Sequence, residues 1–69
     1  MSLSEIAAEA FLAKCRSLPL DKGELGSINL LASYVRSGQY EYDPAAAVLT
    51  TKMRIRICDD GQFLLIDPI

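Results

Sequence analysis

The chain has 69 residues, 51% of them hydrophobic, with seven basic residues, nine acidic residues and no histidine, for a net charge of −2. This length predicts one small domain over residues 1–69, with a core so marginal that self-association is an expected stabiliser. The acidic balance argues against nucleic-acid binding. The absence of histidine removes the usual general base and metal ligand, so we expect no enzyme, no cofactor and no metal.

The first helix is predicted over residues 2–16. Ser2 with Glu5 three positions later is typical of a capping box, in which two side chains satisfy free backbone N–H groups. Lys14 is expected to lay its aliphatic stem on the helix and keep its ammonium in water. The apolar face predicted from helical spacing consists of Leu3, Ile6, Ala7, Ala10, Phe11 and Ala13.

The second helix is predicted from about residue 22 to residue 36. Asp21 with Glu24 is a second capping box, and Gly38 is a natural helix terminator. Gly23 and Gly26 could suggest a phosphate loop, but no strand precedes them and the Lys-Ser/Thr ending is missing. They favour close helix–helix packing instead. The predicted core positions are Leu25, Ile28, Leu31, Ala32 and Val35.

A β-hairpin is predicted over residues 52–67, because Asp60-Gly61 is typical of a two-residue type I′ turn. That turn would place Ile57 opposite Leu64. Residues 39–44 are expected to be extended or turn-like. Residues 45–51 are ambiguous between helix and strand, and the first strand is extended back to about Val48. The predicted core face of the hairpin is Met53, Ile55, Ile57, Leu64 and Ile66.

The predicted fold is therefore α+β, a two-helix hairpin packed on one face of a C-terminal antiparallel β-hairpin in the order α-α-β-β. The sheet would be extended by dimerisation. Only two cysteines, Cys15 and Cys58, are present, which predicts free thiols in a reducing cytoplasm, with a single bridge or a redox role as the alternatives. Glu5 and Glu9 argue against a signal peptide, and no apolar run is long enough to cross a membrane.

The candidate interaction surface lies on the other face of the hairpin. It combines a basic stripe with two apolar side chains and two flanking tyrosines. Its residues are Lys52, Arg54, Arg56, Phe63, Leu65, Tyr40 and Tyr42. Apolar residues surrounded by charge on an open sheet face are typical of binding surfaces.

Three alternatives remain for this surface. In the first, the basic stripe is only a solvent-exposed face of the sheet, in which Arg54 forms an ordinary cross-strand ion pair with Asp67. In the second, residues 40–43 together with Pro68 and Ile69 fold over Phe63 and Leu65 and cover them. In the third, one of the two tyrosines packs on the helices.

A calcium site at the turn is not expected. Asp59-Asp60-Gly61 lacks the ligand series of a calcium-binding loop, and turn chemistry explains these residues.

Residues 31–44 carry a short motif in which Val35 stands three before Gly38, and Tyr40, Asp43 and Pro44 complete Gly-x-Tyr-x-x-Asp-Pro. This segment resembles the conserved stretch of flagellar anti-sigma factors. The resemblance implies a sigma-binding helix after the proline, in a chain that is largely disordered when free. This chain departs from that pattern, because a β-branched run and a hairpin follow and the composition predicts a packed core.

The function expected from the sequence is a small non-enzymatic protein–protein interaction module, a homodimeric adaptor or regulator. Its expected partners are a second copy and another protein. The alternative is a transcription regulator that acts on the polymerase machinery in an anti-sigma-like manner, or on nucleic acid through the basic strand.

Overall fold

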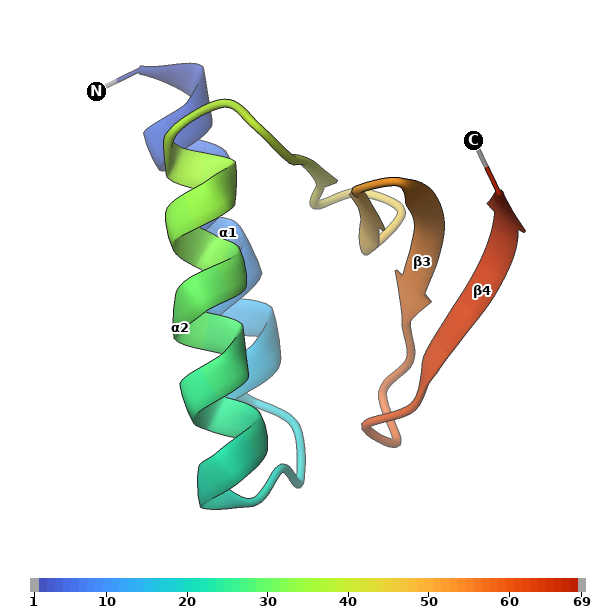
Figure 1. Ribbon diagram of the computed structural model, residues 1–69. Coiled ribbons are helices and arrows are strands. Elements are labelled where there is room, and N and C mark those ends of the chain that lie inside the picture. The colour runs from blue at the N-terminus through green and yellow to red at the C-terminus, as the bar shows by residue number, and fades with distance from the viewer. Residues whose placement is uncertain (1, 69) are drawn as a thin grey trace.

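Figure 1 shows the computed structural model of the chain, which describes residues 2–68. Two helices, α1 (Leu3–Arg16) and α2 (Lys22–Arg36), precede four strands. The strands are β1 (Glu41–Asp43), β2 (Val48–Thr50), β3 (Met53–Ile57) and β4 (Phe63–Pro68). They form one antiparallel sheet in the order β1-β2-β3-β4, with both helices on one side of it (Figure 1). The predicted α+β class is confirmed, and the sheet is larger than the predicted hairpin.

Both helices begin at the capping side chains that were predicted from the sequence. The hydroxyl of Ser2 accepts the Glu5 N–H at 3.3 Å. Asp21 accepts the Glu24 N–H at 2.8 Å, and the Glu24 carboxylate accepts the Asp21 N–H, so the second capping box is complete. Gly38 follows α2 with φ of 84°, a conformation that ends a helix and favours glycine. The predicted helix bounds are confirmed to within one residue.

The buried face of α1 differs from the predicted one. Leu3 and Ile6 are 86% and 50% exposed. The buried residues of α1 are Ala8, Phe11, Leu12 and Cys15. This stripe has the i, i+3, i+4, i+7 spacing of a core-facing helix, whereas the alanine-rich sequence offered a wider apolar arc. Of the predicted face, Phe11 is fully buried and Ala7 and Ala10 are partly buried.

The buried face of α2 agrees with the prediction. Ile28, Ala32 and Val35 are buried, and Leu25 and Leu31 are partly buried against them. The expected close helix approach at the glycines is wrong. A Cβ placed on Gly26 would meet no atom within 4 Å, and one on Gly23 would meet only the Asp21 side chain.

The core joins the helices to one face of the sheet. Phe11 of α1 packs edge-on against Tyr42 of β1, with ring centroids 5.4 Å apart and planes at 68°. Leu49 of β2 and Ile57 of β3 complete this cluster from the sheet side. Aromatic pairs in this geometry add stabilisation beyond the area that they bury. The main contact between the helices and the sheet is therefore α1 against β1, at the far end of the sheet from β4.

Residues 44–47 form a turn, so the helical alternative for this segment is wrong. The Asp43 carboxylate accepts the N–H groups of Ala45 and Ala46, which fixes the reversal between β1 and β2. Ala47 has φ of 54°, the left-handed conformation that completes the turn. The chain reverses again at Thr51 and Lys52, so β2 and β3 are separate strands, and the single strand predicted back to Val48 is wrong.

The turn between β3 and β4 is one residue longer than predicted. Gly61 N–H donates to Cys58 O at 3.0 Å, and Cys58 N–H donates to Gln62 O at 2.9 Å. Residues 59–61 therefore form the loop, with Gly61 at φ of 88°. This three-residue hairpin uses the same Asp-Gly chemistry as the shorter type I′ turn.

The longer turn shifts the register, so Ile57 lies opposite Phe63 instead of Leu64. A shift of one residue moves every side chain of the strand to the other face. Phe63 and Leu65 therefore share the inner face with Ile57 and Ile55, and Leu64 lies on the outer face. The predicted core positions of Met53, Leu64 and Ile66 are wrong, since all three side chains are exposed. A register shift beside Ile55 then restores the predicted pairing of Arg54 with Asp67.

Candidate interaction surface

The edge strand β4 is exposed along its whole described length. Its only neighbour in the sheet is β3, and all six of its residues are exposed. Four consecutive large apolar residues, Phe63, Leu64, Leu65 and Ile66, are 41%, 48%, 58% and 38% exposed. A long edge strand with apolar side chains and free backbone groups is a template for pairing with another chain. We call these four residues the β4 run.

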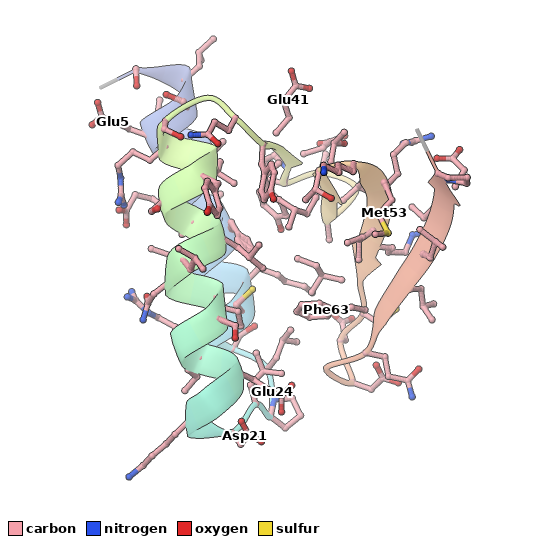
Figure 2. The ribbon with its side chains drawn as sticks, viewed as in Figure 1. Glu5, Asp21, Glu24, Glu41, Met53 and Phe63 are labelled. Carbon is pink, nitrogen blue, oxygen red and sulfur yellow. The ribbon has the colours of Figure 1, made fainter. Side chains whose placement is uncertain are left out.

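The β4 run presents apolar groups on both faces of the sheet. Phe63 and Leu65 lie on the inner face, and Figure 2 shows Phe63 pointing toward the helices. Leu64 lies on the outer face opposite Arg56. Sequence reasoning identified Phe63 and Leu65 as exposed but placed Leu64 and Ile66 in the core. The signal for all four is the absence of charge between residues 61 and 66.

The basic residues and the two predicted apolar residues are not on one face. Arg54 and Arg56 lie on the outer face, whereas Phe63 and Leu65 lie on the inner one. Arg54 forms an ion pair with Asp67 at 3.2 Å, and both side chains are about half exposed. Lys52 lies in the bend between β2 and β3. The predicted stripe is therefore divided between a strand and a bend, with one cation neutralised by its cross-strand partner.

The two predicted tyrosines lie at the opposite end of the sheet from β4. Tyr42 is 7% exposed, and burial is the main cause that raises the pKa of its phenol. Tyr40 packs on Tyr34 of α2, with ring centroids 5.0 Å apart. The alternative in which a tyrosine packs on the helices is thus observed for both. Neither flanks Phe63 or Leu65, and residues 40–43 do not cover those side chains. Pro68 is the last residue of β4, and Ile69 lies outside the described residues.

The tip of the β3–β4 hairpin contacts the helical layer. Lys14, near the end of α1, forms an ion pair with Asp59 in the turn. This hydrogen bond raises the pKa of Lys14 and lowers the pKa of Asp59 from their ordinary values. A Cβ placed on Gly61 would lie 3.6 Å from Pro19 and Leu20, so the turn also packs on the interhelical link. The hairpin is therefore held at its tip, and its outer strand remains uncovered.

The opposite edge of the sheet has protective features that residues 63–66 of β4 lack. Strand β1 has three residues, of which Glu41 and Asp43 are acidic, and Pro44 follows immediately. Short length, charge and proline are the features by which natural sheets prevent edge pairing. The two edges of the sheet therefore differ: β1 is short and acidic, whereas residues 63–66 of β4 form an uncharged apolar run.

The other features that bear on a site are a cavity, buried polar groups, metal-ligand clusters and the two cysteines. An open cavity of about 390 Å³ lies beside the start of α1 and is lined by residues that include Leu3, Ala7, Val35 and Tyr40. Apart from Tyr42 and Cys15, no residue with a polar or charged side chain is buried among residues 2–68. Within the same residues, no three His, Cys, Asp or Glu side chains lie close enough to hold a metal ion. Cys15 is buried and Cys58 half-buried, and both are free thiols.

Comparison with known proteins gives no relative: no family model, no curated protein and no solved structure matches the chain. The helix that the anti-sigma resemblance implies after Pro44 is not formed, because a turn and then β2 follow the proline. Neither α1 nor α2 has the length and apolar character needed to cross a membrane.

Proposed function

We propose that the protein is a small non-enzymatic protein–protein interaction module, a homodimeric adaptor or regulator that binds its partners through β4. The observation that carries this proposal is the uncovered edge of β4, with four successive large apolar side chains on both faces. Isolated exposed apolar residues are normal, but a contiguous apolar strand at a free edge is typical of an interface.

The small size of the domain supports the same proposal. A chain of this length buries only about 60% of the surface that its unfolded form exposes. The cluster of buried residues uses both helices and the inner face of β1, β2 and β3, but no residue of β4. Burial of the β4 run against a partner would add apolar contacts that the monomer lacks. The two free thiols support a reducing compartment, and we place the protein in the cytoplasm.

The alternative, a transcription regulator that uses its basic strand, has less support. Arg54 is paired with Asp67, and Lys52 lies in a bend instead of beside Arg54 and Arg56 on the strand. A phosphate-binding surface needs several cations that act together, and binding then falls steeply with salt. These charged residues are therefore better explained as the polar rim of an apolar interface than as a nucleic-acid site.

Sedimentation equilibrium across a concentration series tests the proposal. The unchanged chain is expected to exceed its monomer mass of 7.6 kDa and to approach twice that value. Leu65→Lys should return it to the monomer. Leu30→Lys is the matched control, because Leu30 lies on α2 and is 57% exposed while Leu65 is 58% exposed. A chain that stays at monomer mass at high concentration, or equal effects of the two variants, would overturn the proposal.

A further inference from the structure

We infer that the partner of β4 is the β4 of a second copy, paired antiparallel about a two-fold axis at Leu64. The inference rests on the proposed function and specifies the partner and register of the same surface. It follows from three properties of the strand. These are the direction of its free backbone groups, the face of each side chain and the position of its charges.

The hydrogen bonds of β3 show which groups of β4 are free. Ile57 N–H donates to Ala47 O at 2.8 Å, toward β2, whereas Cys58 N–H donates to Gln62 O at 2.9 Å, toward β4. Successive residues of an antiparallel strand point their backbone groups to opposite sides. Arg56 and Leu64 are therefore the next hydrogen-bonded pair of β3 and β4. Phe63 and Leu65 consequently direct their N–H and C=O groups to the open edge.

A pairing centred on Leu64 uses these free groups without mismatch. It places Phe63 of each copy opposite Leu65 of the other, so both members of each pair direct their backbone groups into the new ladder. Each hydrogen-bonded pair exchanges two bonds, so the two symmetric pairs supply about four. Leu64 faces Leu64 of the second copy as a non-hydrogen-bonded pair. The ladder with β3 is regular between the Phe63 and Leu65 pairs, and its shift comes after Leu65.

The side chains also match in this register. Residues directly opposite each other in a sheet share a face. Phe63 and Leu65 both lie on the inner face, so the inner apolar surface continues from one copy to the next. A pairing centred on Leu65 would instead set Phe63 opposite Asp67, which lies on the outer face. A pairing centred on Phe63 would run from Leu65 into the turn at Gly61 and lose most of the strand.

The charges favour a second β4 over the other edge of the sheet. No charged residue lies between 61 and 66, and the Leu64-centred register sets Asp67 opposite Gly61. No like charges therefore face each other in the ladder. Pairing of β4 with β1 would bring Glu41 and Asp43 to the apolar strand and would propagate head to tail. The β4–β4 contact is isologous and closes as a dimer, which is the commonest symmetry of soluble oligomers.

Cross-linking through one introduced cysteine tests the register. In a Cys58→Ser background, Leu64→Cys places two thiols across the two-fold axis in a non-hydrogen-bonded pair. Its Cα separation of about 4.5 Å lies within the range that a disulfide spans. Leu64→Cys is expected to form a covalent dimer under mild oxidation. Phe63→Cys and Leu65→Cys are the controls, since each would lie about 7–8 Å from its own copy on the diagonal. Cys15 has no exposed surface and remains in every variant.

Amide hydrogen exchange on the unchanged chain gives a test that needs no substitution. At high protein concentration the amides of Phe63 and Leu65 should exchange more slowly than in dilute solution. The exchange rate of the Leu64 amide should not depend on concentration. Preferred cross-linking at 63 or 65, with a dimer mass by sedimentation, would overturn this register and leave the proposed function intact. A monomer mass with no cross-linking at any of the three positions would overturn both.

Discussion

The ammonium group of Lys14, near the end of α1, donates a hydrogen bond to the carboxylate of Asp59, at the tip of the β3–β4 hairpin. Two other ion pairs are observed among the described residues, and each stays within one layer. Arg36 pairs with Glu9 between the helices, and Arg54 pairs with Asp67 between the strands. Lys14–Asp59 is thus the one ion pair of residues 2–68 that connects the helices to the sheet.

The Lys14–Asp59 contact predicts a defined pH dependence of stability. The hydrogen bond lowers the pKa of Asp59, so its stabilisation is present above the ordinary Asp pKa and is lost as pH falls through the lower folded value. The same bond raises the pKa of Lys14, so that stabilisation is lost only as pH rises through a value above its ordinary range. Asp59→Asn should therefore lower the free energy of unfolding at neutral pH, and the difference should shrink toward both extremes.

A double-mutant cycle separates this ion pair from other effects of the substitutions. Lys14→Gln, Asp59→Asn and the double variant are compared by urea unfolding near pH 7 and again near pH 2. The coupling should be favourable at neutral pH and absent in acid, and added salt should weaken it because both groups are near the surface. A coupling that is equal at the two pH values would show that the contact is not ionic.

Two glycines predict stability changes of opposite sign for the same substitution. A Cβ placed on Gly26 or on Gly38 would meet no atom within 4 Å, so packing does not distinguish them. Gly26 lies inside α2, where Gly26→Ala should add about 1 kcal/mol to the free energy of unfolding. Gly38 has φ of 84°, where Gly38→Ala should remove about 1–2 kcal/mol because the left-handed conformation strains an L side chain.

Thermal and urea unfolding of the two variants measure this difference. Gly38→Asn serves as a further control, since asparagine tolerates the left-handed region better than alanine, and it should recover part of the loss. Equal effects of alanine at the two positions would show that the end of α2 does not depend on the left-handed residue.

The helices were predictable because their signals are local. A capping box and a terminating glycine can each be recognised from a few neighbouring residues. The observed bounds of α2 agree with the capping box of Asp21 and Glu24 and with Gly38. The strands were harder because β1 and β2 have three residues each, too few to show alternation. The alanines at 45–47 favour a helix, but the Asp43 side chain binds the backbone of a turn there.

The register of β4 was mispredicted because Asp-Gly suits both a two-residue and a three-residue loop. Contacts distant in sequence accompany the observed loop, namely Lys14 on Asp59 and the interhelical link near Gly61. Local chemistry contains no information about either contact. The exposure of Phe63 and Leu65 was nevertheless predictable, although the reason given for it was the wrong face of the sheet. The exposed residues of β4 that were missed are Leu64 and Ile66, which the same register error assigned to the core.

The two thiols are predicted to differ in reactivity. Cys15 has no exposed surface, and burial raises the pKa of its thiol to about 11. Cys58 is half-buried. At pH 8 a disulfide reagent should modify Cys58 in the folded chain and reach Cys15 only on unfolding, because the thiolate is the reactive form. Cys58→Ser should therefore abolish fast labelling. Equal native rates for the two thiols would contradict the buried position of Cys15.

The raised pKa of Cys15 also predicts a loss of stability in alkali. Above about pH 8.5 the thiol ionises in the unfolded chain, while in the folded chain it remains protonated up to a pKa of about 11. The unfolded state is therefore favoured progressively as pH rises between these values. Cys15→Ala should make the alkaline fall in the free energy of unfolding shallower, whatever its effect at neutral pH. An unchanged slope would assign the fall to another group.

Two proline substitutions distinguish the free side of β4 from its bonded side. Leu65 directs its N–H to the open edge, so Leu65→Pro removes no hydrogen bond within the monomer, and proline is tolerated at such edge positions. Leu64 directs its N–H to β3, so Leu64→Pro should destabilise the folded chain by about 1–3 kcal/mol through the loss of a ladder bond. Urea unfolding at a concentration low enough to keep the chain monomeric measures both.

The same pair connects stability to self-association. Leu65→Pro should leave the monomer folded and weaken dimer formation, because its N–H would be needed by the second copy. Conversely, Leu64→Pro should weaken both. If Leu65→Pro destabilises the monomer as much as Leu64→Pro does, the backbone directions derived from Ile57 and Cys58 are wrong. If it leaves a folded chain that still dimerises with wild-type affinity, the contact lies on a sheet face and not along the edge of β4.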